Sequence, residues 1–508
     1  MRLSRRSVLG AGLAAAATSA IGIPTVVMGR EKQRKPKNII FIAFDGMAIQ
    51  VPTMADQLQF LNDGKRGYWR TLMGEPYAVN GLQDTGSLNS VVTDSAAASA
   101  AWASGRRQWN GQLNMYPDGT KLRPIIPIMH EAGVKTALVT TTRMTHATPA
   151  AWAVNSPDRN LEGQIAEGMI ASGVDIMLGG GSNFFDPQYR NDRKDAYALA
   201  EQAGFKVVKT RDEVMNLRAP KILGIFARSH LPYTVDHMNS AELKQTVPTL
   251  AELTKVALDN LKGSPNGFVM QIEAGRVDHG GHANDLAGLV FDQIAGEEAV
   301  RTAVEWALND GETLVIITAD HACGGPSLNG AGSSYGDSNA GLQTLNGMKA
   351  SYEVLLPLIA ANPTADKIRD TIKEHLSLEI KPEEAAVIEA ATKNQSPFRA
   401  SSFFGGTGAT TAMILGNYTK VTWTSGNHTS DHVLVTAVGP GAEQCKRVTN
   451  NVEFFDMMLA AKDLKYANPK MTFEEARRAR AASRGTDPEL LALYGAHDDD
   501  CECHHGAA

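Results

Sequence analysis

The chain has 508 residues, of which 43% are hydrophobic and 20% are charged, and its formal net charge is -6. This length and apolar content can bury a large core, and they predict one large domain with insertions or two domains. The acidic balance and the lack of a basic run argue against a nucleic-acid partner.

The first 29 residues are typical of an export signal. Arg5 and Arg6 follow Ser4 and precede an Ala-rich apolar stretch that runs to about Met28. This pattern predicts a twin-arginine signal peptide over residues 1–29 and a periplasmic or secreted protein, with cleavage after residue 20 or 29. A transmembrane anchor over residues 9–28 is the alternative, although its Gly, Ser, Thr and Pro content makes it only mildly apolar. We expect no stable membrane span after signal cleavage.

The cysteines do not form a recognisable pattern. Cys323, Cys445, Cys501 and Cys503 are too few and too scattered to indicate a disulfide framework. Residues 466–508 form a C-terminal region, in which a capping-box pattern at Thr472 predicts the start of a helix. Cys501 and Cys503 lie in the acidic Cys/His tail that ends this region. The tail could hold a metal loosely, but a flexible end is the prediction that we adopt.

Apolar runs that end in polar residues or glycine predict strands buried on both faces. They cover residues 39–44, 136–141, 174–178, 268–272, 314–318 and 433–438. Helical stretches alternate with them at residues 95–104, 125–132, 161–171, 249–261, 286–308 and 452–461. This alternation predicts an α/β fold with a mostly parallel central sheet flanked by helices on both faces.

Residues 324–425 predict an insertion within this sheet. The segment begins with a loop rich in Gly, Ser and Asn. Helical pieces follow at residues 349–359, 365–375 and 383–392, and another ends at about residue 417. We expect a helical or loop lobe that interrupts the sheet, and the sequence leaves open whether it builds a dimer contact or a lid.

Acidic residues and a histidine follow three of the predicted strands. Asp45, Glu273 and the pair Asp320-His321 come directly after the runs that end at residues 44, 272 and 319. A carboxylate after a strand is often only a turn or cap residue. In an open α/β sheet, however, the carboxyl ends of the strands share the edge where ligands bind. Three such coincidences therefore predict metal ligands gathered at one place.

Two further segments carry candidate site residues, one a pair of metal ligands and the other a serine at a helix start. Asp278 and His282 are four residues apart in Asp-His-Gly-Gly-His, a spacing that suits two ligands of one metal, although a surface helix start would read similarly. Ser95 follows Asp94 at the start of an Ala-rich helix, where exposed N–H groups and the helix dipole favour an anion. From this segment alone, a simple helix cap is the favoured interpretation of Ser95.

These motifs resemble alkaline phosphatases, in the same order along roughly residues 36–465. The matching segments are Thr93-Asp94-Ser95-Ala96-Ala97, Thr142 to Ala150, Asp158-Arg159, Glu273 to His282, Thr318-Ala319-Asp320-His321 and His428 to Pro440. The resemblance implies an alkaline phosphatase catalytic domain that hydrolyses phosphate monoesters through a phosphoserine at Ser95. Members of the family are often dimers, so the resemblance also implies a homodimer.

The resemblance further implies two Zn²⁺ ions and one Mg²⁺ ion. One zinc would take Asp278, His282 and His428, and the other would take Asp45, Asp320 and His321, with Ser95 at its open position. Magnesium would take Asp45, Thr148 and Glu273. Arg159 would grip two phosphate oxygens, and Asp94 would hold that guanidinium.

Three positions carry particular questions. His432 lies four residues from His428, which is chosen because its distance to Gly439-Pro440 matches the family pattern. His146 and His279 occupy positions where the best-known bacterial members of the family have Asp and Lys. This pair of histidines resembles the animal forms and some marine bacterial forms. This leaves the identity of the third metal open.

Other functions have less support. A sulfatase would need Cys or Ser followed by x-Pro-x-Arg, whereas Ala96-Ala97-Ala98-Ser99 follows Ser95. A phosphodiesterase of the same superfamily commonly uses Thr and has less need of Arg159. A non-catalytic binder of metal or phosphate would keep these ligands without turnover, but none of the catalytic motifs is missing.

Overall fold

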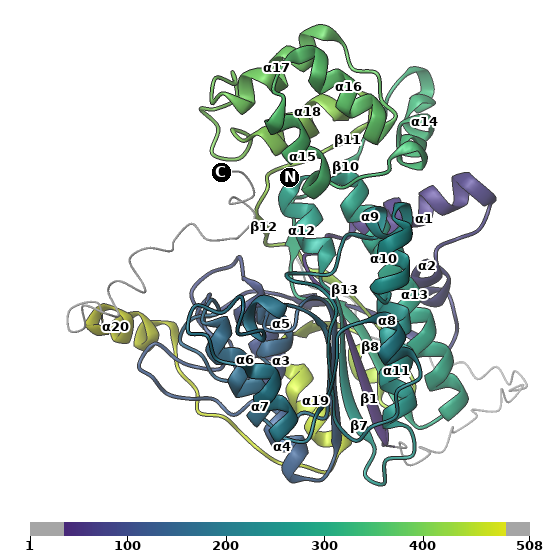
Figure 1. Ribbon diagram of the computed structural model, residues 1–508. Helices are drawn as coiled ribbons and strands as arrows, with labels where there is room; N and C mark the ends of the chain where they lie inside the picture. Colours follow the sequence, from purple (N-terminus) through teal and green to yellow (C-terminus); the bar gives the residue numbers. More distant parts are fainter. Residues whose placement is uncertain (1–34, 484–508) are drawn as a thin grey trace, which may run out of the picture. The chain divides into compact units, whose positions relative to one another are not determined.

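A ten-stranded sheet forms the centre of the protein (Figure 1). The structure is a computed structural model that describes residues 35–483. The strands lie in the order β14-β2-β13-β8-β1-β7-β3-β4-β6-β5, and β13 runs antiparallel to its neighbours β8 and β2. The other neighbouring pairs are parallel, so the prediction of a mostly parallel α/β sheet is confirmed. The predicted signal peptide and the Cys/His tail lie outside the described residues.

Each of the six predicted strands corresponds to a strand of this sheet. The ten strands are β1 (Asn38–Phe44), β2 (Ala78–Asp84), β3 (Lys135–Arg143), β4 (Ile176–Gly180), β5 (Lys206–Val208), β6 (Ile222–Ile225), β7 (Phe268–Ala274), β8 (Thr313–Ala319), β13 (Val433–Val438) and β14 (Val448–Asn450). Two small two-stranded sheets pair β9 (Ala322–Cys323) with β12 (His428–Thr429) and β10 (Ser327–Leu328) with β11 (Val421–Thr422).

The sheet is buried because helices cover both of its faces (Figure 1). Along β1, Ile40, Ile42 and Phe44 join one core while Ile39 and Phe41 join the other, as the period of two in a strand requires. The first core also holds helices α1 (Gln50–Asp63), α2 (Tyr68–Met73), α8 (Arg211–Met215), α9 (Thr234–Asn239), α10 (Ala241–Thr246), α11 (Leu250–Leu261) and α13 (Leu286–Asp310). The second holds α3 (Ser95–Ser104), α4 (Ile125–Glu131), α5 (Ala147–Ala150), α6 (Glu162–Ala171), α7 (Ala196–Gln202) and α19 (Glu453–Ala461).

Between β8 and β13 the chain leaves the sheet and forms a helical lobe, drawn in green in Figure 1. Its helices are α14 (Asp337–Gln343), α15 (Tyr352–Ala361), α16 (Ala365–Leu376), α17 (Pro382–Thr392) and α18 (Thr407–Thr419). The chain then returns as β13, which pairs directly with β8. The remaining α-helices of the described residues are α12 (Arg276–Ala283) after β7 and α20 (Phe473–Ser483) after α19.

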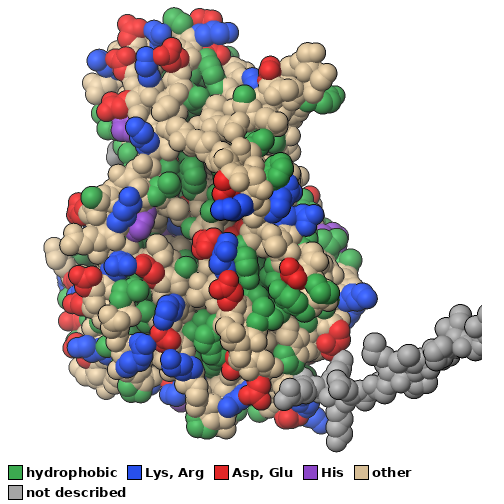
Figure 2. Space-filling model, turned by 90° about the vertical axis from the view of Figure 1, so that its right-hand side faces the viewer, with side chains coloured by type: hydrophobic (Ala, Val, Ile, Leu, Met, Phe, Trp, Pro, Cys, Tyr) green, Lys and Arg blue, Asp and Glu red, His purple; other side chains and the backbone are tan. Residues whose placement is uncertain are grey.

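Figure 2 shows the face that carries α1, α11 and α13, where acidic and basic side chains are interspersed. Within residues 35–483, no helix combines the length and the apolar character that crossing a bilayer requires.

Candidate active site

The order of the central strands brings three predicted metal-binding segments together. β1 lies between β8 and β7, and all three strands run in the same direction. Asp45 after β1, Asp320 and His321 after β8, and Glu273 at the end of β7 therefore share one edge of the sheet. All four side chains are fully buried.

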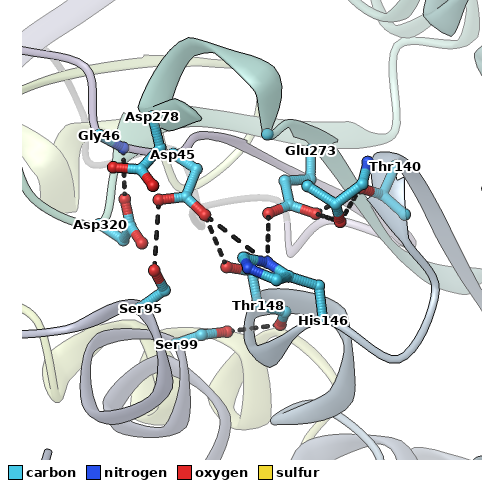
Figure 3. Close-up of polar contacts among 12 residues, drawn as sticks. Asp45, Gly46, Ser95, Ser99, Thr140, His146, Thr148, Glu273, Asp278 and Asp320 are labelled. Carbon is cyan, nitrogen blue, oxygen red and sulfur yellow. Dashed lines mark hydrogen bonds and ion pairs between the residues drawn. The ribbon is translucent and has the colours of Figure 1, made fainter. Parts of the chain in front are cut away.

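The first group consists of Asp45, Asp320 and His321, and Ser95 lies directly against it. Figure 3 shows Ser95 next to Asp45 and Asp320. The Ser95 hydroxyl lies 3.4 Å from Asp45 Oδ1 and 3.2 Å from His321 Nε2. Asp320 Oδ1 accepts hydrogen bonds from the backbone N–H groups of Gly46 and His321, each at 3.0 Å. These bonds fix one carboxylate oxygen and leave Oδ2, which accepts no hydrogen bond from the described residues, facing the group.

Helix α3 presents Ser95 at its first turn. Asp94 caps this helix, since its Oδ1 accepts a hydrogen bond from Ala97 N at 2.9 Å. The small alanines of α3 are buried, which lets the helix pack closely on the sheet edge. Ser95 therefore combines a buried hydroxyl with the positive end of a helix dipole, a setting that favours an approaching anion.

The second group consists of Asp278, His282, Cys323 and His428. Asp278 and His282 lie one turn apart on α12, and Asp278 Oδ2 is 3.3 Å from His282 Nε2. His428 comes from β12 and places its Nε2 3.5 Å from Asp278 Oδ1. The structure thus brings His428 into this group, whereas His432 is exposed.

The two imidazoles of this group face each other in a way that calls for a cation. His282 Nδ1 lies 2.7 Å from the carbonyl oxygen of Gly426, and His428 Nδ1 lies 2.8 Å from that of Thr93. A carbonyl only accepts, so each Nδ1 carries a proton, and Nε2 is the atom of each ring that can present a lone pair to a metal ion. The two Nε2 atoms are only 2.9 Å apart. Their lone pairs repel unless a proton or a metal ion lies between them.

The third group consists of Asp45, His146 and Glu273, with Thr148 beside it (Figure 3). His146 Nδ1 lies 3.9 Å from Asp45 Oδ2 and 4.0 Å from Glu273 Oε1. Thr148 donates its hydroxyl hydrogen to Asp45 Oδ2 at 3.3 Å. Asp45 therefore serves two groups, one through each carboxylate oxygen.

Glu273 is held in place from β3. Its Oε2 accepts hydrogen bonds from the hydroxyls of Thr140 and, at 3.1 Å, Thr142. Its Oε1, by contrast, is buried and accepts no hydrogen bond from the described residues. One oxygen is thus positioned by the protein and the other is directed at the third group.

Arg159 lies beside Asp94, the N-cap of α3, and its side chain is partly exposed. Its Nη1 donates to Asp94 Oδ2 at 3.3 Å, and its Nη2 lies 3.0 Å from His146 Nε2. The side chain of Arg159 keeps 21% of its surface exposed, so the guanidinium can meet a ligand from solvent. Each of the sequence-predicted site residues therefore lies in or next to the three groups, including His279, whose ring packs 5.6 Å from that of His146.

Negative charge is concentrated in this buried site. Burial, and then the neighbouring Asp320, raises the pKa of Asp45 well above its usual 3.8. Burial also raises the pKa of Glu273 to about 7 and that of Asp320 to about 6. For Asp278 burial acts in the same direction, but His282 and His428 outweigh it and hold its pKa well below 3.8.

The histidines at the third group have the opposite tendency. Burial lowers the pKa of His146, and the cation of Arg159 lowers it further. Burial and Arg276 do the same to His279. Both shifts favour the neutral form of the rings, which adds no positive charge beside the carboxylates.

The donors fit divalent cations. Among the residues that the structure describes, Asp278 Oδ1, Asp320 Oδ2 and Glu273 Oε1 are buried and accept no hydrogen bond. In each of the three groups the donor atoms lie within 4.8 Å of one another. Buried carboxylates without partners are costly, and metal coordination is the usual way to compensate them.

The structure adds two residues to the site, Cys323 and His230, that the sequence patterns did not predict there. Cys323 was noted only as one of the scattered cysteines, although it lies three residues after Asp320. His230, which follows β6 after a short loop, packs its ring 4.2 Å from that of His279 and lies 2.7 Å from Arg143 Nη1. No motif in the sequence marks His230, because its neighbours in the chain carry no metal-ligand pattern.

Comparison with known proteins agrees with this geometry. Residues 36–464 match the family model described as alkaline phosphatase. The chain is 28% identical to alkaline phosphatase 3 of Bacillus subtilis (strain 168) over 433 residues, which cover 83% of this chain and 88% of that protein. It is 31% identical to the repressible alkaline phosphatase of Saccharomyces cerevisiae over 394 residues, 70% of this chain and 65% of that one.

A solved structure supports the same assignment. The crystal structure of Thermus thermophilus alkaline phosphatase superposes with a TM-score of 0.83 at 33% identity, covering 88% of this chain and 96% of that chain. The mostly parallel sheet gathers three candidate metal-binding groups around a serine at one edge, as a hydrolase of this fold requires. The chain belongs to the alkaline phosphatase family, as its motifs predicted. It is a phosphoric monoester hydrolase.

Proposed function

We propose that the protein hydrolyses phosphate monoesters by transferring the phosphoryl group to Ser95, with two zinc ions and one magnesium ion in the three groups. One observation carries this proposal. The Ser95 hydroxyl lies at a helix N-terminus and within 3.4 Å of both Asp45 Oδ1 and His321 Nε2, which belong to one metal-binding group. A nucleophile needs such activation, because a neutral serine hydroxyl attacks phosphorus poorly.

The donor types suggest which ion each group takes. One zinc would be held by Asp278, His282 and His428, and the other by Asp45, Asp320 and His321, since imidazole and carboxylate donors suit zinc. Magnesium would be held by Asp45, Thr148 and Glu273, an all-oxygen set, with His146 and His279 supporting it from outside. Bound there, the ions would lower the pKa of the Ser95 hydroxyl and neutralise charge on the attacking and leaving oxygens.

The chain's own residues would bind and orient the substrate. Arg159 presents a planar guanidinium that can donate two hydrogen bonds to the phosphate, and Asp94 keeps it in place through the 3.3 Å contact. The N-terminus of α3 directs backbone N–H groups towards the same anion. Ser95 Oγ then bonds to phosphorus as the ester oxygen leaves, and water later cleaves the phosphoserine to release phosphate.

Substitution of the nucleophile tests the proposal. Ser95→Ala should lower kcat for an aryl phosphate by about 10³-fold or more, because it removes the atom that bonds to phosphorus. Metal content, measured by mass spectrometry of the dialysed protein, should stay at the wild-type level. Ser104→Ala removes a hydroxyl from the last residue of the same helix and should leave kcat unchanged. Near-normal turnover in Ser95→Ala would show that another group is the nucleophile.

The cellular setting and assembly are part of the same proposal. The Arg5-Arg6 pattern supports export by the twin-arginine route to the periplasm or the outside of the cell. Membership of the family supports a homodimer, with residues 36–465 as the catalytic domain and residues 324–425 inserted in it. Cell fractionation and light scattering would test the location and the assembly.

A further inference from the structure

Cys323 lies opposite His428 in the small sheet next to the second metal-binding group. β9 and β12 pair antiparallel, and Cys323 and His428 are direct partners in their register. Side chains of directly opposed residues in an antiparallel pair point to the same face. The Cys323 thiol is therefore on the side of this sheet where His428 meets Asp278 and His282.

A glycine on α12 allows the helix to approach this thiol. A Cβ atom at Gly281 would lie 3.0 Å from Cys323 Cβ and 3.1 Å from its Sγ, which is closer than ordinary contact. Gly281 immediately precedes His282 and follows Asp278 by three residues. The close approach therefore puts the sulfur beside the two ligands that α12 carries.

The four donor atoms form one compact group. Asp278, His282, Cys323 and His428 each offer an atom, and these atoms lie within 4.8 Å of one another. Around a tetrahedral zinc ion, neighbouring donors would be roughly 3.3–3.6 Å apart, as follows from zinc bonds of about 2.0–2.3 Å. Small rotations of the side chains would therefore close this group around one ion.

A second feature, independent of the cysteine, points to a ligand in the same place. Asp278 is 4% exposed, and its Oδ1 accepts no hydrogen bond from the described residues. The lone pairs of His282 Nε2 and His428 Nε2 also converge there at 2.9 Å. A cation at this point would be compensated by the Asp278 carboxylate and could accept both lone pairs.

We infer that Cys323 supplies a sulfur donor to the metal ion held by Asp278, His282 and His428. This inference rests on the proposed function, because it assumes that the group binds a metal. Coordination would exchange the thiol proton for the metal, so that a zinc–sulfur bond forms and a proton is released to solvent. One Cys, two His and one Asp complete the four donors that zinc prefers.

The sulfur donor has a consequence for metal choice. Thiolate is a soft ligand that binds zinc or cobalt well and magnesium poorly. Cys323 would therefore make this group more selective for zinc than its carboxylate and imidazoles alone. A substrate oxygen that joined the ion would be a fifth donor, an expansion that catalytic zinc sites accommodate.

Cobalt substitution tests the inference by spectroscopy. Co²⁺ bound to a thiolate gives a sulfur-to-metal charge-transfer band in the near ultraviolet, which oxygen and nitrogen donors do not produce. The full-length protein, reconstituted with Co²⁺, should show this band, and Cys323→Ser and Cys323→Ala should lose it. Competition with a chelator should show zinc held about 10- to 100-fold more weakly in both variants.

Matched cysteine variants serve as controls. Cys445→Ser changes the other cysteine within residues 35–483, which is buried in the second core, and should keep the band. Cys501→Ser combined with Cys503→Ser should also keep it, which excludes the tail as the source of sulfur. Circular dichroism of each variant establishes that the fold is intact.

The possible results separate this inference from the proposed function. Loss of the band and weaker zinc binding only in the Cys323 variants support the inference. Cobalt uptake without a band in the wild type, or a band that persists in Cys323→Ser, overturns it and leaves the proposed function standing. A wild-type protein that binds neither Co²⁺ nor Zn²⁺ overturns both.

Discussion

Gly46 connects two of the metal-binding groups, and its replacement by alanine should disrupt both. It follows Asp45 at the end of β1, has a φ of +68° and donates its N–H to Asp320 Oδ1 at 3.0 Å. A Cβ atom on Gly46 would lie 2.4 Å from Asp278 Oδ1 and 2.6 Å from Asp278 Cα. The Cα belongs to α12, so the clash cannot be relieved by a side-chain rotation alone.

The magnitude can be worked out by comparison with a second glycine. Gly64 ends α1 with a φ of +75°, and a Cβ atom there would have no neighbour within 4 Å. Gly64→Ala should therefore cost only the left-handed backbone penalty of about 1–2 kcal/mol. Gly46→Ala should lower the free energy of unfolding by the same amount and by about 1–3 kcal/mol more, because its Cβ atom would be overpacked against Asp278.

Two separate measurements on both variants test the expected difference. Denaturant unfolding in the presence of a chelator gives the difference in the free energy of unfolding between the two variants. Zinc content after dialysis should remain at the wild-type level in Gly64→Ala and fall in Gly46→Ala. Equal stability and equal zinc content in the two variants would refute the close approach of Gly46 to Asp278.

Two further substitutions probe the substrate contact and the buried charge outside the site. Arg159→Ala should lower kcat/KM for a phosphate monoester by about 10- to 100-fold, because charged hydrogen bonds contribute about 1.5–3 kcal/mol. Arg159→Lys should recover only part of the lost kcat/KM, since an ammonium lacks the planar fork of the guanidinium. Unchanged kinetics in both variants would contradict the role of this guanidinium. Burial raises the pKa of Glu297 to about 7 from its usual 4.5, so its contribution to stability is present below pH 4.5 and is lost as the pH rises through about 7. Glu297→Gln should remove this pH dependence of the free energy of unfolding, which amounts to about 3 kcal/mol by pH 8. Chemical denaturation of both proteins at several pH values measures it, and an unchanged slope in Glu297→Gln would contradict the assignment.

The fold was predictable where the chain is buried on both faces. Residues 433–438 and 95–104 were predicted as a strand and a helix with the bounds that β13 and α3 have. Continuous apolar runs and an Ala-rich stretch have few alternatives in a large core. The strand predicted at residues 174–178 is shifted by two residues, since β4 continues through Gly179 and Gly180, which the sequence pattern marks as a loop.

The strands nearer the edges of the sheet escaped prediction for a physical reason. β2 has the sequence AVNGLQD, which contains Gly and Asn and lacks an apolar run. Its conformation depends on pairing with β13 and β14, contacts that are distant in sequence. β5 and β6 have only three and four residues and depend on the sheet in the same way.

The candidate site was predictable because its residues stand at the ends of strands. Asp45, Glu273 and Asp320 could be found from that position alone, and the resemblance supplied their grouping. Cys323 and His230 could not be found in this way. Their places depend on the β9–β12 register and on the loop after β6, which only the folded chain defines.

The residue that carries phosphate during turnover can be identified by trapping the phosphorylated protein. The enzyme, mixed with an aryl phosphate and quenched in acid within its first turnovers, can be digested and its peptides mapped by mass spectrometry. We expect a phosphorylated peptide with the group on Ser95, and no such peptide from Ser95→Ala. Phosphate on a different residue, or rapid turnover with no phosphorylated peptide, would contradict it.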